Sequence, residues 1–205
     1  MICVIDYGVG NIQSFINLYR NLGFDVKRAR VSSDIYDATK FIFPGVGHFD
    51  HAMQKFNNSG LRPVLEKAVL FHKVPLLGIC VGMQMLASGS DEGDLPGLNW
   101  IPGKVKAFAS NQLLNDFTLP HMGWNDVIAS QSSTLFSKGF DEVAQFYFLH
   151  SYYFDVFDKT NVAAIANYGV PFEAAVSLGH IHGVQFHPEK SHHCGEQLLK
   201  NFAEM

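Results

Sequence analysis

The chain has 205 residues, of which 47% are hydrophobic and 17% are charged, and 15 Lys and Arg against 19 Asp and Glu give a net charge of −4. This composition allows a sizeable core and excludes a globally disordered chain. The slightly acidic balance, without any basic run, argues against nucleic acid as the main ligand.

The sequence indicates a cytoplasmic protein with no membrane segment. None of its apolar stretches is long enough to cross a bilayer. The first residues, MICVIDYGVGN, indicate a strand and a turn, without the basic start and cleavage site of a signal peptide. The three cysteines, Cys3, Cys80 and Cys194, are too few and too scattered for a disulfide framework, as expected in a reducing cytosol.

The first half of the chain alternates short apolar strands with helical patterns. Helical spacing of apolar residues predicts one helix from about 12 to 22 and a second from about 50 to 72, where an interruption near NNSG stays open. Strands are expected at residues 2–6, 25–30, 40–43 and 74–79. A strand–helix–strand order predicts a parallel sheet with helices on both faces.

The second half consists of shorter strand-like runs with turn residues between them, and a closing helix at 195–203. The runs are WIPGKVKAF, VAQFYFLHSYYF, VAAIANYG, PFEAAVSLG and HIHGVQFHPE. We therefore predict an α/β fold with a mostly parallel central sheet, helices on both faces and additional antiparallel strands. No repeat or linker interrupts the chain, so we expect a single domain over residues 1–205.

The stretch PLLGICVGMQ indicates a nucleophile at Cys80. Gly78 and Gly82 remove side chains on both sides of the cysteine, as a sharp strand-to-helix turn requires. A helix formed by VGMQML would place its N-terminus at the sulfur and favour a thiolate. The alternative is a small buried cysteine beside a glycine turn.

The stretch GVQFHPEK supplies a base for this nucleophile. The expected strand 183–186 leads to His187, and Glu189 lies two residues further on, so both side chains project to the same side of an extended chain. Glu189 would then orient the imidazole toward Cys80. The alternative is a surface histidine beside a solvated glutamate.

Acyl transfer also needs hydrogen-bond donors for an oxyanion. One candidate is the backbone N–H of Val81, directly after the cysteine, and another is that of Val46 or Gly47 in PGVGHF. The alternative for PGVGHF is an ordinary Gly/Pro turn. The histidine clusters HIH and HHC lack a complete set of metal ligands, so we expect neither a metal nor another cofactor.

The pair PLLGICVGMQ and GVQFHPEKS resembles the class I, triad-type glutamine amidotransferases, which have a flavodoxin-like fold. DYGVGNIQS, FPGVGHF, LPHMGWN and FYFLHSYY resemble the glutaminase subunits of imidazole glycerol phosphate synthase, in order and over essentially the whole chain. The residue after the nucleophile is valine where leucine is usual, which leaves the backbone donor intact.

The resemblance implies a reaction and its residues. Cys80 attacks the side-chain amide carbon of glutamine, and His187, held by Glu189, protonates the departing ammonia and then activates water against the thioester. The amides of Val81 and of the Val46–Gly47 segment stabilise the oxyanions. The products are glutamate and ammonia.

The resemblance also implies substrate and partner contacts. Gln84 is a substrate contact, and the backbone of Gly47 and of His150, Ser151 and Tyr152 holds the amino-acid end of glutamine. The ammonia passes to a (β/α)₈-barrel cyclase subunit in a heterodimer, which makes imidazole glycerol phosphate and an aminoimidazole carboxamide ribotide for histidine biosynthesis. Asn11, Tyr152 and Lys190 match positions that face the partner in this family.

Three other functions stay open at the level of sequence. A paralogous amidotransferase would supply ammonia for modified sugars of surface polysaccharides with the same glutaminase motifs. A stand-alone γ-glutamyl hydrolase or peptidase would keep the nucleophile and need no partner. A non-catalytic interaction module would keep the fold alone, although such a role needs none of the three residues Cys80, His187 and Glu189.

Overall fold

A computed structural model describes residues 1–108, 117–141 and 143–205 of the chain. The first half alternates strands and helices, as its sequence pattern predicts. Its elements are β1 (Ile2–Ile5), α1 (Ile12–Asn21), β2 (Val26–Ala29), η1 (Ser32–Ile35), β3 (Lys40–Gly45), α2 (Phe49–Asn58), α3 (Arg62–Glu66), η2 (Lys67–Phe71), β4 (Leu76–Cys80) and α4 (Val81–Gln84).

The second half is rich in antiparallel strands and ends in a helix. Its elements are β5 (Gly103–Ala107), β6 (His121–Ala129), β7 (Ala144–His150), β8 (Tyr152–Val156), η3 (Lys159–Asn161), β9 (Val162–Tyr168), β10 (Val170–Leu178), β11 (Ile181–Val184), η4 (Pro188–Lys190) and α5 (His192–Glu204).

The strands form one sheet that contains both parallel and antiparallel pairs. Its order is β2-β1-β3-β4-β11-β10-β9-β6-β7, and β8 pairs with both β10 and β5. The five strands from β2 to β11 are parallel. All pairs beyond β11 are antiparallel. The predicted α/β class with added antiparallel strands is therefore confirmed.

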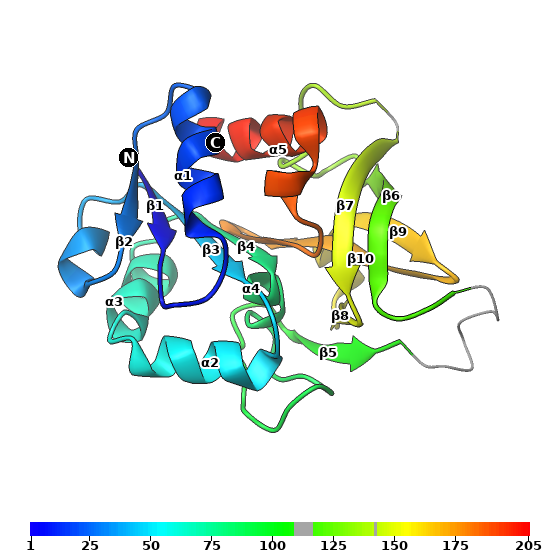
Figure 1. Cartoon of the computed structure of the whole chain (residues 1–205), viewed down its shortest axis with the longest axis horizontal. Coiled ribbons are helices and arrows are strands. Elements are labelled where there is room, and N and C mark those ends of the chain that lie inside the picture. The colour runs from blue at the N-terminus through cyan, green and yellow to red at the C-terminus, as the bar shows by residue number, and fades with distance from the viewer. Residues whose placement is uncertain (109–116, 142) are drawn as a thin grey trace.

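Helices cover both faces of the parallel strands, as expected for strands that are apolar on both sides. Figure 1 shows α1 and α5 together on one face, with α2 and α3 on the other. Phe15 of α1, Phe56 of α2 and Phe202 of α5 are at most 1% exposed in the core that this packing encloses. The buried strands β3 and β4 run between the two helix layers.

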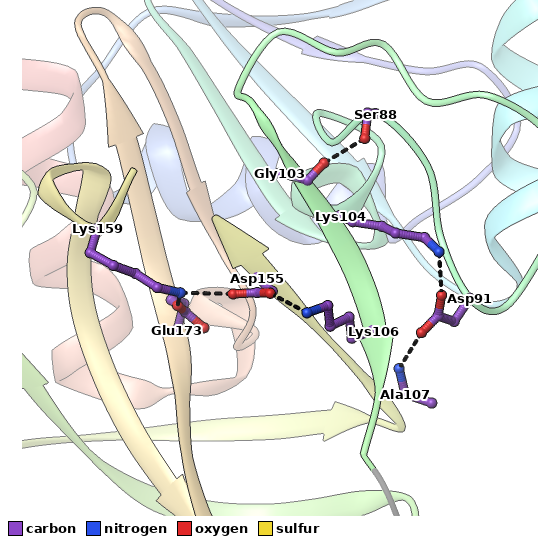
Figure 2. A network of polar contacts seen from close by, with 9 residues as sticks. All are labelled: Ser88, Asp91, Gly103, Lys104, Lys106, Ala107, Asp155, Lys159 and Glu173. Atoms are coloured by element: carbon purple, nitrogen blue, oxygen red, sulfur yellow. Dashed lines mark hydrogen bonds and ion pairs between the residues drawn. The ribbon is translucent and has the colours of Figure 1, made fainter. Parts of the chain in front are cut away.

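Ion pairs connect the strands β5, β8 and β10 (Figure 2). Lys159 Nζ lies 2.7 Å from Asp155 Oδ1 on β8 and 2.6 Å from Glu173 Oε1 on β10. Asp155 also pairs with Lys106 of β5. Glu173 is 8% exposed, so this pairing supplies a buried carboxylate with the partner that it needs.

Several predicted boundaries are wrong by a few residues. Strand β3 continues through Pro44 and Gly45 instead of ending at residue 43, because Gly45 still pairs with Cys80. The helical stretch predicted at 50–72 is, by contrast, interrupted at 59–61, which confirms the interruption near NNSG that the sequence left open. The helix after Cys80 is only one turn, Val81–Gln84, and the last helix starts at His192 instead of residue 195.

Among the residues that the structure describes, we find no helix with the length and apolar character needed to cross a membrane.

Candidate active site

The predicted catalytic residues meet where the parallel strands end. Strands β3, β4 and β11 are neighbours, and the carboxyl ends of parallel strands share one edge of a sheet, where ligands of such folds bind. A cavity of about 350 Å³ opens at this edge. It is lined by Val46, Gly47, Cys80, Val81, Gln84, Glu92, Pro120, Leu149, His150, Ser151, Tyr152, His187 and Lys190.

Cys80 occupies a strained turn between β4 and α4. Its φ of 54° and ψ of −115° are unusual for a residue with a side chain, and such strain is found at functional sites. The turn is possible because Gly82 has no side chain. A Cβ at this position would lie 1.9 Å from the carbonyl oxygen of Phe43. A Cβ at Gly78 would lie 2.8 Å from the oxygen of Gly82. Both glycines are therefore required by close backbone packing.

His187 lies three residues beyond the end of β11, and neighbouring elements fix its backbone. Its N–H donates to the carbonyl oxygen of Tyr147 at 2.8 Å, and its own carbonyl accepts from Ser191 Oγ at 2.6 Å. The predicted strand 183–186 is shorter, because β11 ends at Val184. Two residues in a bend then carry the chain to His187.

Glu189 holds one nitrogen of the His187 ring. Glu189 Oε1 lies 2.8 Å from His187 Nδ1, and both side chains are 4% exposed. The predicted pairing is present, but the predicted extended chain is wrong, since Glu189 lies in the short 3₁₀ turn η4. Pro188 favours this turn because its fixed φ suits a first helical position.

The electrostatic environment of His187 favours its protonated form. Burial by itself lowers the pKa of His187, but the influence of Cys80 and the hydrogen bond with Glu189 outweigh burial and raise the pKa well above its usual range. Cys80 and His187 thus line one cavity, and the Glu189 carboxylate holds the imidazole. A thiol, an imidazole and an orienting carboxylate are the groups that acyl transfer through a cysteine uses.

The predicted oxyanion loop lies beside the cysteine. Gly45, at the end of β3, pairs with Cys80 at the end of β4, so Val46 and Gly47 enter the cavity directly next to the sulfur. Gly47 has a φ of 83°, which a glycine adopts without strain. Val81 is the first residue of α4, where backbone N–H groups have no partner within the helix.

Tyr7, which the sequence analysis did not single out, anchors the strand before this loop. Its hydroxyl donates to the carbonyl oxygen of Pro44 at 2.7 Å. Tyr7 is buried, and burial raises the pKa of its hydroxyl far above the ordinary value. Only the position of Tyr7 in DYGVGN, directly after β1, signals its closeness to the strand ends.

The predicted substrate contacts line the cavity, but Gln84 is also tied to protein groups. Its Nε2 donates to the carbonyl oxygen of Tyr152 at 3.2 Å and to Gln185 Oε1 at 3.0 Å. Gln185 Nε2 lies 3.7 Å from Cys80 Sγ. The structure thus connects Gln84 to Cys80 through a second buried glutamine that the sequence analysis missed.

The three predicted partner-facing residues separate into two groups. Tyr152 and Lys190 line the cavity, and Lys190 Nζ lies 5.6 Å from the centre of the Tyr147 ring. Asn11 lies outside the cavity, where its side chain accepts the N–H of Ser14 at 3.4 Å and caps α1.

Glu92 is an acidic residue of the cavity that the sequence analysis missed. Its Oε2 accepts the backbone N–H of Phe49 at 2.7 Å, which fixes the carboxylate at the start of α2. Glu92 and Lys190 thus bring opposite charges to one cavity, as recognition of a zwitterion requires.

In the described part of the chain, no group of three or more His, Cys, Asp or Glu side chains could hold a metal ion.

Comparison with known proteins agrees with this geometry. The family model "Glutamine amidotransferase class-I" matches residues 3–205. A solved structure titled "Crystal structure of glutamine amidotransferase" superposes with a TM-score of 0.76 at 18% identity, covering 99% of this chain and 97% of that one. The structure of PurLQS from Thermotoga maritima gives a TM-score of 0.75 at 17% identity with the same coverage. At these identities the solved structures establish the fold alone.

Curated relatives are far more similar. "Imidazole glycerol phosphate synthase subunit HisH" of Bdellovibrio bacteriovorus is 55% identical over all 205 residues, and covers 100% of both chains. The protein of the same name from Leptospira borgpetersenii is 46% identical, again over 100% of both chains. The chain therefore belongs to the class I glutamine amidotransferase family, among the relatives named HisH.

Proposed function

We propose that this chain is the glutaminase subunit of an imidazole glycerol phosphate synthase. It hydrolyses glutamine to glutamate and ammonia, and the ammonia is used in histidine biosynthesis. The observation that carries the proposal is the convergence of Cys80, His187 and Glu189 on one cavity of a chain whose full-length relatives bear that name.

In the first half of the reaction, Cys80 Sγ attacks the side-chain carboxamide carbon of glutamine. The thiol proton passes to His187, which delivers it to the departing ammonia as the C–N bond breaks, leaving a γ-glutamyl thioester. Glu189 stabilises the imidazolium that forms and keeps its Nδ1 turned away from the sulfur.

In the second half, His187 takes a proton from water as the water oxygen attacks the thioester carbon. The C–S bond breaks, the sulfur recovers a proton, and glutamate leaves. The backbone N–H of Val81 and that of Val46 or Gly47 bind the oxyanion in both halves, because these segments flank the sulfur.

The ends of the cavity suit the amino-acid end of glutamine. Glu92 offers a carboxylate for the ammonium group, and Lys190 offers a cation for the α-carboxylate. The backbone of Gly47 and of the segment His150–Tyr152 supplies further hydrogen-bonding groups. Gln84 fixes this segment through the Tyr152 carbonyl.

The partner is a (β/α)₈-barrel cyclase subunit, with which the chain forms a cytoplasmic heterodimer with lyase activity. Large apolar side chains are exposed at the cavity: Leu149 lines it, Met122 is paired with Leu149 across the two strands, and Leu119 precedes Pro120 of the cavity wall. An exposed apolar surface of this kind is typical of an interaction site. We assign Asn11, Tyr152 and Lys190 to the surface that contacts this partner. Residues 1–205 act as one amidotransferase domain, which the continuous sheet supports.

The test is glutamate release from glutamine by the purified chain, with and without the barrel subunit from the same organism and its nucleotide ligand. We expect low activity alone and a strong rise when both are added. Brisk turnover without any partner would contradict the proposal and indicate a stand-alone hydrolase. An active chain that does not respond to this barrel would place it with a different synthase, such as one for surface sugars.

A further inference from the structure

Two buried histidines are hydrogen-bonded to each other beside the cavity, and only one of them lines it. His121 begins β6 and His150 ends β7, where they are paired across the two strands. His121 Nδ1 lies 2.8 Å from His150 Nε2. The residues are 3% and 6% exposed, and His150 lines the cavity whereas His121 does not.

The neighbouring groups determine where the protons lie. His150 Nδ1 is 2.7 Å from the carbonyl oxygen of Tyr152, which can only accept, so Nδ1 carries the proton. In the neutral ring His150 Nε2 then accepts, and His121 Nδ1 must donate to it. Asn125 Nδ2 donates to the remaining nitrogen, His121 Nε2, at 3.2 Å. Asn125 itself is oriented because its Oδ1 accepts the N–H of Asp126 at 2.8 Å.

Both rings are held neutral and in place. The His121 ring is stacked between Phe148 and Tyr168, with ring centres 4.7 Å and 4.0 Å away and interplanar angles of 22° and 24°. Burial lowers the pKa of His121 to about 4. Burial, opposed by the bond to the Tyr152 carbonyl, lowers the pKa of His150 to about 3. A second proton on either ring would turn two N–H groups toward each other.

This series of hydrogen bonds ends at the carbonyl oxygen of Tyr152, a residue that lines the cavity. The Tyr152 carbonyl accepts from His150 and also from Gln84 Nε2, at 3.2 Å. Gln84 continues to Gln185, whose amide reaches Cys80 Sγ at 3.7 Å. Gln84 and Gln185 are at most 2% exposed, so each of these polar contacts lies in the protein interior, where losing one is costly.

We propose that His121 is a positioning residue for the glutaminase reaction, which acts as a neutral donor through His150. It fixes the Tyr152 carbonyl, and with it the Ser151–Tyr152 backbone and the Gln84 amide that line the cavity. This inference rests on the proposed function, because it assigns that wall of the cavity to glutamine.

The test compares two variants of His121 with a matched control. His121→Phe keeps a ring between Phe148 and Tyr168 but removes the donor to His150. His121→Asn loses the ring but keeps an N–H near the position of Nδ1. The control is His182→Phe, because His182 is also 3% exposed and loses one hydrogen bond, to Ser177 Oγ at 2.8 Å.

The readout is the rate at which Cys80 is labelled, with the barrel subunit bound, by two electrophiles. The glutamine analogue 6-diazo-5-oxo-L-norleucine must occupy the substrate cavity, whereas iodoacetamide needs only an accessible sulfur. In His121→Phe we expect labelling by the analogue to be about tenfold slower, since a buried acceptor loses its donor. Labelling by iodoacetamide should stay within about twofold of wild type. His121→Asn should recover most of the loss, and His182→Phe should label at the wild-type rate.

The inference is contradicted if His121→Phe reacts with the analogue at the wild-type rate, or if both electrophiles slow equally. If the wild-type protein itself is not labelled by the analogue, the proposed function fails, and this inference with it.

A second measurement needs no variant. Nitrogen-15 NMR of histidine-labelled wild-type protein should find His121 and His150 both neutral and protonated at Nδ1 at pH 6. An Nε2–H form of either ring would overturn the proposal.

Discussion

The ring of His187 lies between a sulfur and a carboxylate, and these two partners decide its charge. Burial alone would keep the ring neutral, yet the influence of Cys80 and the hydrogen bond with Glu189 raise its pKa. The Nδ1–Oε1 distance of 2.8 Å and the 4% exposure of both side chains make the carboxylate effective, because little water screens it.

Replacing Glu189 by Gln should therefore lower the pKa of His187 and slow the reaction. The amide oxygen of glutamine can still accept from Nδ1, but it carries no charge to stabilise the imidazolium. We expect kcat of the complex to fall by roughly 10²–10⁴. An NMR titration of the His187 ring should give a lower pKa than in wild type. A variant with wild-type kcat would refute the role of Glu189.

Tyr19 allows a test of stability away from the cavity. It lies in α1 at 0% exposure, and its hydroxyl has no hydrogen-bond partner among the described residues. Burying an unpaired hydroxyl costs free energy, so Tyr19→Phe should leave stability unchanged or raise it by about 1 kcal/mol. Urea unfolding measures this difference. Clear destabilisation would mean that the hydroxyl has a bonded partner.

The turn at the end of β4 depends on close packing of two backbones. A Cβ at Gly82 would meet the Phe43 carbonyl oxygen at 1.9 Å, whereas a Cβ at Gly89 would meet nothing within 4 Å. Gly82→Ala should therefore destabilise the protein by at least about 2–3 kcal/mol and reduce labelling of Cys80. Gly89→Ala, the matched control, should change the free energy of unfolding by less than about 0.5 kcal/mol. Equal effects of the two variants would contradict this account of the turn.

Elements encoded by local pattern could be predicted from the sequence. The apolar run ending at Cys80 and the flanking glycines predict the strand and the turn, and the structure has both. The role of Cys80 as nucleophile stays a prediction. The His187–Glu189 pair is predicted for the wrong reason, because Pro188 produces a 3₁₀ turn where an extended chain was expected. Strand β3 is longer than predicted because its pairing with β4 continues through Pro44 and Gly45.

Residues placed by long-range pairing could not be predicted in this way. His121 and His150 are 29 positions apart and meet only because β6 and β7 pair in one particular register. Glu92 reaches the cavity from an irregular segment with no periodic pattern, fixed by its bond to Phe49. Neither His121 nor Glu92 carries a local signal that separates it from the other histidines and glutamates of the chain, and for His150 the sequence analysis predicted a backbone contact with glutamine but not the bond to His121.

At the scale of the whole molecule, three buried neutral histidines couple folding to pH. Burial lowers the pKa of His121 to about 4, of His150 to about 3 and of His182 to about 4. Unfolded histidines take up protons near pH 6.5. As the pH falls from about 6.5 toward 4, the unfolded state therefore binds more protons than the folded state, and stability falls.

The contribution of His187 to stability depends on pH with the opposite sign and over a different pH range. Because its pKa is raised, its contribution is fully present below about pH 6.5 and is lost as the pH rises through the raised value. It therefore does not offset the loss in acid.

Urea unfolding at pH 6.5 and pH 5, where the contribution of His187 is nearly constant, should show a loss of about 1–2 kcal/mol for each of the three histidines. His182→Phe should reduce this loss of unfolding free energy by the amount that one histidine contributes. A stability that is flat between these two pH values would contradict the neutral, buried state of the histidines.

The central claim is that Cys80 carries the γ-glutamyl group during hydrolysis. The most direct measurement is to mix the chain and its barrel subunit with carbon-14-labelled glutamine, quench with acid, and map the label by peptide mass spectrometry. We predict one γ-glutamyl group on the peptide that contains Cys80, and neither label nor glutamate release in Cys80→Ala. Glutamate release by Cys80→Ala, or label on a different residue, would contradict the account.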